Sequence, residues 1–279
     1  TIVALGTSAP ELIITITSAQ SGATDLIIGN AIGSNLCNLL LILGLMAIIH
    51  PVLIDEEAKK IHIPVALLSA IVILIIELCN FGSARAFIDR IDGILLVILF
   101  VAYFVFPIFT EIKDIKKAFK ENKNNEESKK INVFVSILFI AIGVVLLKFG
   151  GDFVVDNATL IAEHFNISER VIGLTIVAIG TAMPELVTSI VSIIRKDTDL
   201  AVGNLVGSCV LNLFLILGIG AIITPLEFSN EFNQNLILLI VASFILWMFN
   251  FIGKKNTITR FKGIILLGIF SLYIAGLLV

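Results

Sequence analysis

Long apolar stretches separated by short polar ones run along the whole chain. Each is about 20 residues long, the length at which a helix crosses the hydrocarbon core of a bilayer. Nine spans are expected, at residues 1–20, 25–49, 62–79, 91–110, 133–149, 171–194, 199–223, 235–251 and 261–279. The mixed polar and apolar stretch at 153–170 predicts a helical extension at the membrane surface rather than a span. The pattern therefore predicts an all-α polytopic membrane protein.

Two parts of this pattern are near copies of each other. Residues 1–51 align with residues 175–225 at a constant offset of 174, and 28 of the 51 positions are identical. Each copy contains Gly-Thr-x-x-Pro-Glu and, further on, Gly-Asn-x-x-Gly-Ser. Duplicated hydrophobic segments interrupted by Gly and Pro are the best sequence indication of a secondary transporter's binding site. We expect a first repeat at 1–110 (motif 1–51), a linker at 111–130 and a second repeat at 131–279 (motif 175–225).

The basic residues predict how the spans are oriented. Fifteen of the 19 Lys and Arg residues fall in alternate connections, including seven lysines in the stretch 111–130. Cytoplasmic loops carry such an excess of basic residues. We therefore expect 111–130 to be a solvated cytoplasmic linker. The span at 1–20 then runs outward and its copy runs inward, so the two repeats are inverted.

The two repeats differ in length before their motifs. About forty residues precede the motif in the second repeat, whereas the first opens directly on it. We expect two inverted repeats of five transmembrane helices, with the first helix of repeat 1 absent from this chain. The surface beside 1–20 is then expected to show an unfilled groove or an apolar face.

Composition agrees with a membrane protein and excludes other classes. The chain is 58% hydrophobic and 15% charged, with a mean hydropathy of +1.06 and a net charge of −3. It has no long basic segment with interleaved aromatics, so we expect no nucleic-acid partner. The three cysteines lie in or beside apolar stretches, which does not indicate a disulfide framework.

Each motif places a carboxylate, Glu11 or Glu185, inside an apolar span. A charge there costs about 2.5–3.5 kcal/mol or more, which indicates a functional site. Pro10 and Pro184 cannot donate to the carbonyl four residues back, so we expect freed carbonyls that line a polar cavity. Thr7 shares a helix face with Glu11. A simple proline kink with a snorkelling glutamate is disfavoured because both copies carry every element.

The next span of each repeat adds a polar stripe with a spacing of four residues. Its members are Asn30, Ser34 and Asn38 in the first repeat, and Asn204, Ser208 and Asn212 in the second. Glycines 29, 33, 203 and 207 beside the stripe also predict a seam of close helix packing, and both interpretations can hold. Asp25 and Asp199 are expected to be N-caps. Carboxylate, amide and hydroxyl oxygens without a cluster of His or Cys suit hard cations such as Ca²⁺ and Na⁺.

The sequences GTSAPEL…GNAIGSNLCN and GTAMPEL…GNLVGSCVLN resemble the two alpha repeats of the Ca²⁺/cation antiporter superfamily, most closely its prokaryotic Na⁺/Ca²⁺ exchangers. The resemblance covers essentially the whole chain and implies ten spans in two inverted halves. It implies that Glu11 and Glu185 ligate Ca²⁺, aided by Thr7 and Thr181. The further Na⁺ and Ca²⁺ ligands that it implies are Ser8, Ser34, Asn38, Ser208, Asn212 and the carbonyls of Ala4 and Ala178.

The chain departs from the family pattern at two positions. Ala182 stands where the first repeat has Ser8, and a hydroxyl at this place usually lines a sodium position, so the Na⁺ stoichiometry is left open. Asn212 stands where the K⁺-dependent branch carries Asp, and a neutral side chain there speaks against K⁺ co-transport.

Four functions are compatible with two buried carboxylates. We favour Na⁺-driven Ca²⁺ antiport, with H⁺-driven Ca²⁺ antiport as the alternative. A cation channel is disfavoured because the acids form a pair and not a ring, and a carboxylate-dyad hydrolase leaves the Ser and Asn stripes unexplained. We expect no enzyme activity and no cofactor. The expected protein is a monomer in the cell membrane whose partners are Ca²⁺, Na⁺ and the lipid bilayer.

Overall fold

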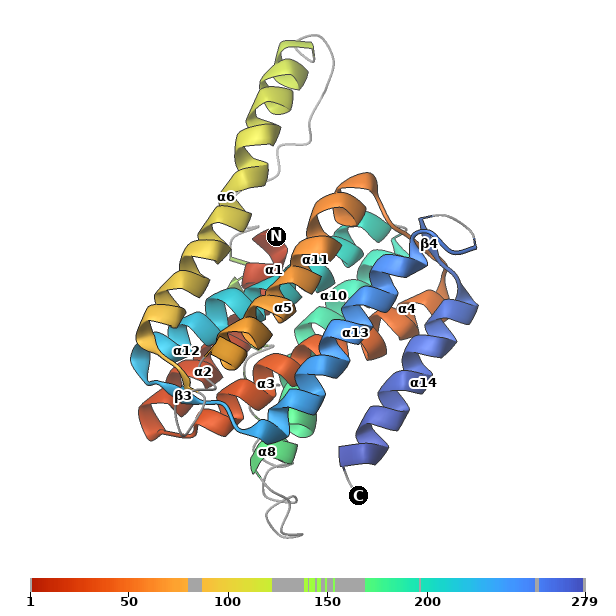
Figure 1. Cartoon of the computed structure of the whole chain (residues 1–279). Coiled ribbons are helices and arrows are strands. Elements are labelled where there is room, and N and C mark those ends of the chain that lie inside the picture. Colours follow the sequence, from red (N-terminus) through yellow and green to blue (C-terminus); the bar gives the residue numbers. More distant parts are fainter. Residues whose placement is uncertain are drawn as a thin grey trace.

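The computed structural model of the protein describes residues 2–79, 87–121, 169–195, 197–253 and 256–277, with short pieces between 138 and 153. These parts are almost entirely helical (Figure 1). The first repeat contains α1 (Ile2–Thr7), α2 (Ala9–Ser21), α3 (Thr24–Leu36), η1 (Cys37–Ile42), α4 (Leu43–Ile49), η2 (Ala58–His62), α5 (Ile63–Cys79) and α6 (Arg90–Glu121). The second contains α8 (Glu169–Ile172), η3 (Gly173–Val177), α9 (Ala178–Thr181), α10 (Met183–Ile194), α11 (Thr198–Leu211), η4 (Asn212–Ile216), α12 (Leu217–Ile223), η5 (Asn230–Phe232), α13 (Asn233–Phe249) and α14 (Arg260–Leu277).

A helix lies at each predicted span that the structure describes. Four stretches of the described chain are long and apolar enough to cross a membrane: Thr24–Ile49, Ala58–Cys79, Thr198–Ile223 and Arg260–Leu277. A further pair, Gly173–Thr181 and Met183–Ile194, is bent by 48° at its break. The expected span at 133–149 and the surface extension at 153–170 lie largely outside the described residues. The prediction of a polytopic helical membrane protein is confirmed.

Helix α6 is longer than the sequence analysis predicts. It continues to Glu121 and projects beyond the other helices (Figure 1). The first part of the predicted linker 111–130 is therefore helical, and its role as a linker stays a prediction. Residues 111–121, EIKDIKKAFKE, are good helix formers without Gly or Pro, so the helix does not end where the apolar run ends. Residues 122–130 lie outside the described part of the chain.

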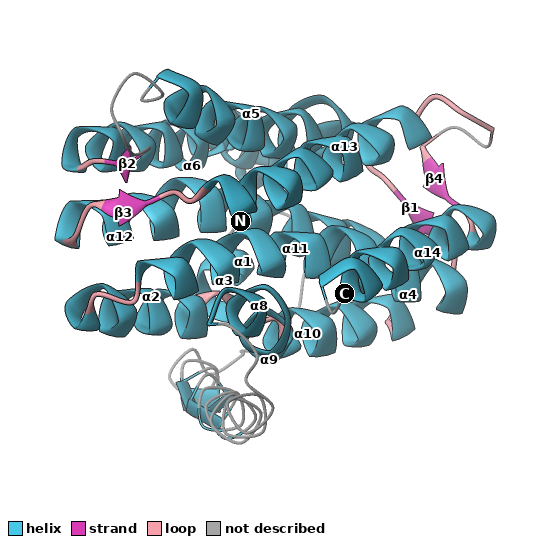
Figure 2. Ribbon diagram, turned by 60° about the horizontal axis from the view of Figure 1, so that its bottom comes forward, coloured by secondary structure: helices cyan, strands magenta, loops and turns pink. Residues whose placement is uncertain are grey.

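Two short antiparallel strand pairs join the repeats at opposite ends of the molecule (Figure 2). At one end β1 (Val52–Leu53) of the first repeat pairs with β4 (Thr257–Ile258) of the second. At the other end β2 (Phe87–Ile88) pairs with β3 (Leu226–Glu227).

The two motif spans run in opposite directions between these ends. Helix α2 leads into α3, which contacts β3, whereas the equivalent helix α10 leads into α11, which contacts β1. The C-terminal ends of α2 and α10 therefore point to opposite ends of the molecule. The repeats are inverted, as the distribution of basic residues predicts.

Glycines allow helices of the two repeats to pack at very short distances. A Cβ at Gly263 on α14 would lie 2.8 Å from the carbonyl oxygen of Gly44 on α4. At a second contact between the repeats, a Cβ at Gly93 on α6 would lie 2.7 Å from the carbonyl oxygen of Gly218 on α12. Close backbone contact of this kind is a common way for membrane helices to associate.

The predicted packing seam is confirmed on one side only. At Gly33 a Cβ would lie 2.6 Å from the carbonyl oxygen of Leu174, so this position admits only glycine without a shift of the helices. At Gly203 no atom of the described residues lies within 4 Å of such a Cβ. The prediction is therefore not confirmed at Gly203.

The two predicted N-caps are also wrong. Helix α3 begins at Thr24 after Ala23, and Asp25 lies within its first turn. Helix α11 is capped by Asp197, whose side chain accepts a hydrogen bond from the backbone N of Leu200 at 3.1 Å. Each helix starts one residue earlier than predicted, at the preceding threonine. The two aspartates instead lie in the first turn, where a negative charge interacts favourably with the helix dipole.

Large apolar side chains are exposed on the outer helices and on the motif helices. Ile91 on α6 is 76% exposed and Leu272 on α14 is 75% exposed. Beside the 1–20 span, Val3 and Ile13 are exposed as well. Side chains of this kind suit contact with lipid, whereas α3, α4, α11 and α12 are largely buried at the centre.

Candidate cation site

The two motif glutamates lie just after matching breaks in their helices. The breaks are at Ser8, with φ −87° and ψ 14°, and at Ala182, with φ −78° and ψ 1°. Pro10 and Pro184 follow in the first turns of α2 and α10. Proline is favoured there because the backbone N–H groups of a first turn have no partner within the helix. The breaks therefore place each carboxylate at the N-terminal end of a short helix in the interior.

All eleven residues that the sequence predicts for the site are buried. Glu11 is 1% exposed and Glu185 is 0% exposed. The other nine are Thr7, Thr181, Ser8, Ser34, Asn38, Ser208, Asn212, Ala4 and Ala178.

The motif helix of each repeat is hydrogen-bonded to the polar stripe of the other. The Thr7 hydroxyl donates to Asn204 Oδ1 at 3.3 Å, and the Thr181 hydroxyl donates to Asn30 Oδ1 at 3.1 Å. These two bonds are equivalent under the offset of 174. The sequence placed all four residues on suitable faces, but only the structure shows that the pairs cross between repeats.

The serines make the two sides of the site unequal. Ser8 Oγ donates to Glu185 Oε1 at 3.0 Å, and Ser208 Oγ donates to the same oxygen at 3.2 Å. On the opposite side, Ser34 lies 3.2 Å from the Thr181 hydroxyl. The position equivalent to Ser8 is Ala182, which has no hydroxyl to offer. The departure seen in the sequence therefore falls inside the site.

The Ala4 and Ala178 carbonyls, which the family resemblance implies as ligands, are still hydrogen-bonded within their helices and are not freed by the breaks. The Ala4 oxygen accepts from Ser8 N at 2.9 Å and from the Thr7 hydroxyl at 3.3 Å. The Ala178 oxygen accepts from Ala182 N at 3.1 Å and from the Thr181 hydroxyl at 3.3 Å. The missing proline N–H affects Gly6 and Gly180 instead, because they stand four residues before Pro10 and Pro184. Ala4 and Ala178 nevertheless line the site.

Asn35 is a site residue that the sequence analysis missed. Its Nδ2 donates to the backbone oxygen of Cys209 at 3.0 Å, and its Oδ1 accepts from Asn212 Nδ2 at 3.0 Å. It orients the Asn212 amide and joins the two central helices. No repeat signal could have identified it, because the aligned residue in the second repeat is Cys209.

Four buried oxygens of the site have no hydrogen-bond partner among the described residues. They are Glu11 Oε2 and Asn38 Oδ1 from the first repeat, and Glu185 Oε2 and Asn212 Oδ1 from the second. Glu11 and Glu185 are related by the offset of 174, and so are Asn38 and Asn212. Buried polar atoms are almost always satisfied in proteins, so matched exceptions call for an explanation. Two carboxylate and two amide oxygens are chemically suited to a hard cation.

Glu77 on α5 is a further buried carboxylate, outside the two-glutamate site, that the sequence analysis missed. It is 1% exposed, and its Oε1 accepts a hydrogen bond from Asn233 Nδ2 on α13 at 3.1 Å. The available signal was a charged residue within the apolar stretch 62–79.

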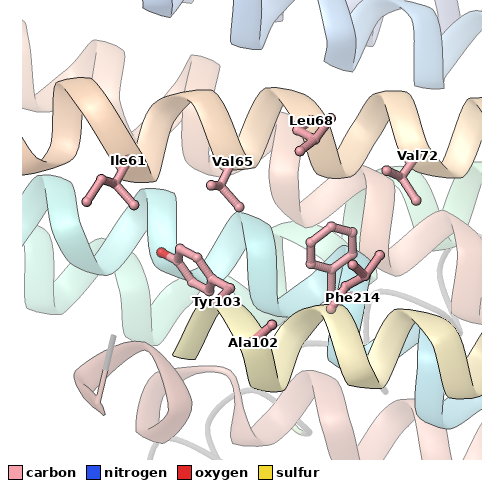
Figure 3. Close-up of a pocket in the computed structure, with 8 residues that line it drawn as sticks. Ile61, Val65, Leu68, Val72, Ala102, Tyr103 and Phe214 are labelled. Atoms are coloured by element: carbon pink, nitrogen blue, oxygen red, sulfur yellow. The ribbon is translucent and has the colours of Figure 1, made fainter. Parts of the chain in front are cut away.

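An apolar cavity of about 340 Å³ lies apart from these residues, between α5, α6 and η4 (Figure 3). Ile61, Val65, Leu68 and Val72 form one wall, and Leu99, Ala102, Tyr103 and Phe214 complete it. Tyr103 OH is hydrogen-bonded to His62 Nδ1 at 2.8 Å. A lining of this kind offers a cation almost no ligands, so this cavity is a poor candidate for a cation site.

The fold and the site together define a membrane transport protein of the inverted-repeat class, with a buried polar site at the interface of the repeats. The chain belongs to the sodium/calcium exchanger family, because the family model described as "Sodium/calcium exchanger protein" matches residues 1–109 and 135–279. This agrees with the family resemblance of the paired motifs.

Individual relatives cover nearly the whole chain. The chain is 32% identical to the inner membrane protein YrbG of Escherichia coli, over 99% of this chain and 84% of that protein. It is 30% identical to the sodium/calcium exchanger MaX1 of Methanosarcina acetivorans, over 100% of this chain and 87% of that protein. A solved structure of the sodium-calcium exchanger NCX_Mj superposes with a TM-score of 0.75 at 32% identity, covering 99% of this chain and 84% of that chain.

Proposed function

We propose that this protein is a secondary antiporter that exchanges Ca²⁺ for Na⁺ by alternating access at the two-glutamate site. The observation that carries the proposal is the set of four unpartnered buried oxygens, two from each repeat. Family membership and the names of the sodium/calcium exchangers MaX1 and NCX_Mj support it. Transport of ions also explains the site without any enzymatic reaction.

In this proposal the carboxylates of Glu11 and Glu185 bind Ca²⁺ directly and balance its two charges. The amide oxygens of Asn38 and Asn212 provide further ligands for the ion positions on either side of the two carboxylates. Hydroxyl and carbonyl oxygens around them serve Na⁺ and Ca²⁺ in turn, and they belong to Thr7, Thr181, Ser8, Ser34, Ser208, Ala4 and Ala178. Because both ions need the same carboxylates, binding of one displaces the other, and this competition couples their movements.

A second candidate is H⁺-driven Ca²⁺ antiport at the same site. Ala182 favours it, because the hydroxyl at the equivalent of Ser8 is missing and a Na⁺ position loses one ligand. Protons compete with cations for closely spaced carboxylates in either case. A weaker Ca²⁺ affinity in acid is therefore expected for both candidates and does not distinguish them.

The proposed setting is the cell membrane, with a monomer as the functional unit. Residues 111–130 are placed in the cytoplasm by the excess of basic residues, and the β1–β4 end of the molecule with them. The β2–β3 end then faces outward.

Ca²⁺ uptake into proteoliposomes under an imposed gradient tests the proposal. We expect uptake when vesicles loaded with Na⁺ are diluted into Na⁺-free medium that contains radiolabelled Ca²⁺. No uptake is expected in Na⁺-free vesicles with a pH gradient alone. Uptake driven only by the pH gradient would establish the proton antiporter, and absence of uptake under both gradients would refute antiport of Ca²⁺.

A further inference from the structure

Two more buried hydroxyls occupy equivalent places in the motif helices. Thr15 on α2 and Ser189 on α10 are both 0% exposed, and neither hydroxyl has a hydrogen-bond partner in the part of the chain that the structure describes. They are related by the same offset of 174 that relates the site residues. Each stands four residues after its glutamate, so it lies one helical turn further along the same face.

Several other helical hydroxyls of this protein bond to the preceding turn. Thr17 donates to the backbone oxygen of Ile13 at 3.0 Å, and Ser271 donates to that of Leu267 at 2.9 Å. Such bonds to the preceding turn are the ordinary way in which a helix satisfies Ser and Thr. Thr15 and Ser189 forgo this bond in the interior, where an unsatisfied hydroxyl is costly.

The two hydroxyls belong to buried polar helix faces that run toward different ends of the molecule. Beyond them the face continues to Ser18 on α2 and Ser192 on α10, which are also buried. Helix α2 leads to the β2–β3 end and α10 leads to the β1–β4 end. Thr15 does not face lipid, because its Cγ2 would lie 3.2 Å from a Cβ placed at Gly220 of α12.

We infer that Thr15 and Ser189 are transient ligands on the two halves of the ion path. Thr15 lies between the two-glutamate site and the outer face, and Ser189 lies between the site and the inner face. Each offers one oxygen to a Ca²⁺ or Na⁺ ion that has lost part of its hydration shell and has not yet reached the glutamates. This inference rests on the proposed function, because it assumes that ions reach the two-glutamate site from the outer face along one repeat and from the inner face along the other.

Side-specific transport kinetics test it on the full chain. Thr15→Val keeps the shape of threonine and removes the hydroxyl, and Ser189→Ala does the same for serine. Ca²⁺/Ca²⁺ exchange is measured in inside-out and right-side-out vesicles, since it needs neither Na⁺ nor proton coupling. Thr15→Val is expected to raise the half-saturating Ca²⁺ concentration on the outer side by about fivefold, the ratio that ~1 kcal/mol produces. Ser189→Ala is expected to do so on the inner side.

Three controls separate this role from a structural one. Thr15→Ser keeps the hydroxyl and is expected to restore normal kinetics, and Thr17→Val removes an already bonded hydroxyl from the same helix and is expected to change nothing. Equilibrium Ca²⁺ binding to purified Thr15→Val is expected to stay within about twofold of the unsubstituted protein, because the glutamates are intact. Thermal unfolding is expected to be unchanged or shifted upward, since an unsatisfied buried donor is removed.

The possible failures are distinct. Unchanged kinetics in both variants, or equal changes on both sides, would overturn the inference while leaving the proposed function intact. A loss of equilibrium Ca²⁺ binding in Thr15→Val would also overturn it, by making Thr15 part of the central site. Absence of any Ca²⁺ flux in the unsubstituted protein would refute the proposed function itself and this inference with it.

Discussion

Replacement of Glu11 or Glu185 by Gln is the most direct test of the proposed site. Glutamine has nearly the same shape and keeps one carbonyl oxygen, so the change is mainly the loss of one charge. Both side chains are buried, with exposed fractions of 1% and 0%, so water does not screen that loss. Removal of one partner from a buried charged pair costs about 3–5 kcal/mol. Because about 1.4 kcal/mol corresponds to a factor of ten, Ca²⁺ affinity is expected to fall roughly 10²- to 10⁴-fold.

Folding is expected to survive these substitutions. Glu185 Oε1 accepts hydroxyl bonds from Ser8 and Ser208, and the amide oxygen of a glutamine can accept the same two bonds. The Ca²⁺-free variants should therefore unfold at temperatures close to that of the unsubstituted protein. Binding of radiolabelled Ca²⁺ to purified protein gives the affinity, and Na⁺-driven uptake into proteoliposomes gives transport.

Glu77→Gln is a closely matched control. Glu77 is another buried glutamate in a membrane helix, 1% exposed, but its bonded partner is Asn233 and it lies outside the site. Its replacement is expected to leave Ca²⁺ affinity within about threefold. Retention of Ca²⁺ affinity within about tenfold by Glu11→Gln or Glu185→Gln would refute direct ligation. So would an equal loss in Glu77→Gln, which would indicate a general effect of removing charge from the protein.

Three further predictions address packing, coupling and pH. Gly218→Ala places a Cβ 2.9 Å from a backbone oxygen of α6, so we expect a loss of about 1–3 kcal/mol in thermal unfolding, whereas Gly268→Ala, with no atom within 4 Å, should have little effect. Ala182→Ser supplies the missing hydroxyl and is expected to lower the Na⁺ concentration for half-maximal Ca²⁺ release; an unchanged Na⁺ dependence would exclude this position as a Na⁺ ligand. The hydrogen bond from a neighbouring lysine lowers the pKa of Glu56 below its usual value, so its stabilising contribution is present above the pKa of the unfolded chain, near 4.3, and is lost as the pH falls through the lower folded pKa. The difference in melting temperature between Glu56→Gln and the unsubstituted protein should accordingly disappear in acid and persist at neutral pH.

The parts of the site that sequence could predict are those that recur in both repeats. Pro10 and Pro184 predicted matching breaks, and the structure has them at the residues two positions earlier. Burial of Glu11 and Glu185 followed from charge inside an apolar span, and the inverted arrangement followed from the positions of basic residues. The assignment of individual ligands remains a prediction, since it depends on ions rather than on the fold.

The parts that sequence could not predict depend on contacts without a repeat or on local helix ends. Asn35 has no polar counterpart, so nothing in the alignment indicated its bonds across the central helices. The continuation of α6 to Glu121 was hidden because hydropathy reports where a membrane ends and not where a helix ends. Asp25 and Asp199 were misassigned as caps because the threonine before each one already belongs to the helix.

The hydrogen bonds of the site also explain why the two motifs occur as a pair. Thr7 is bonded to Asn204, and Thr181 is bonded to Asn30, so each motif helix is held by the stripe of the other repeat. Glu185 likewise accepts hydrogen bonds from both repeats, one from Ser208 of its own repeat and one from Ser8 of the other. Once the two halves depend on each other in this way, a change in one half alters the environment of the carboxylate in the other. The difference between Ser8 and Ala182 therefore makes the two glutamates unequal, and the order in which they release an ion can differ even though the backbone breaks before them are nearly the same.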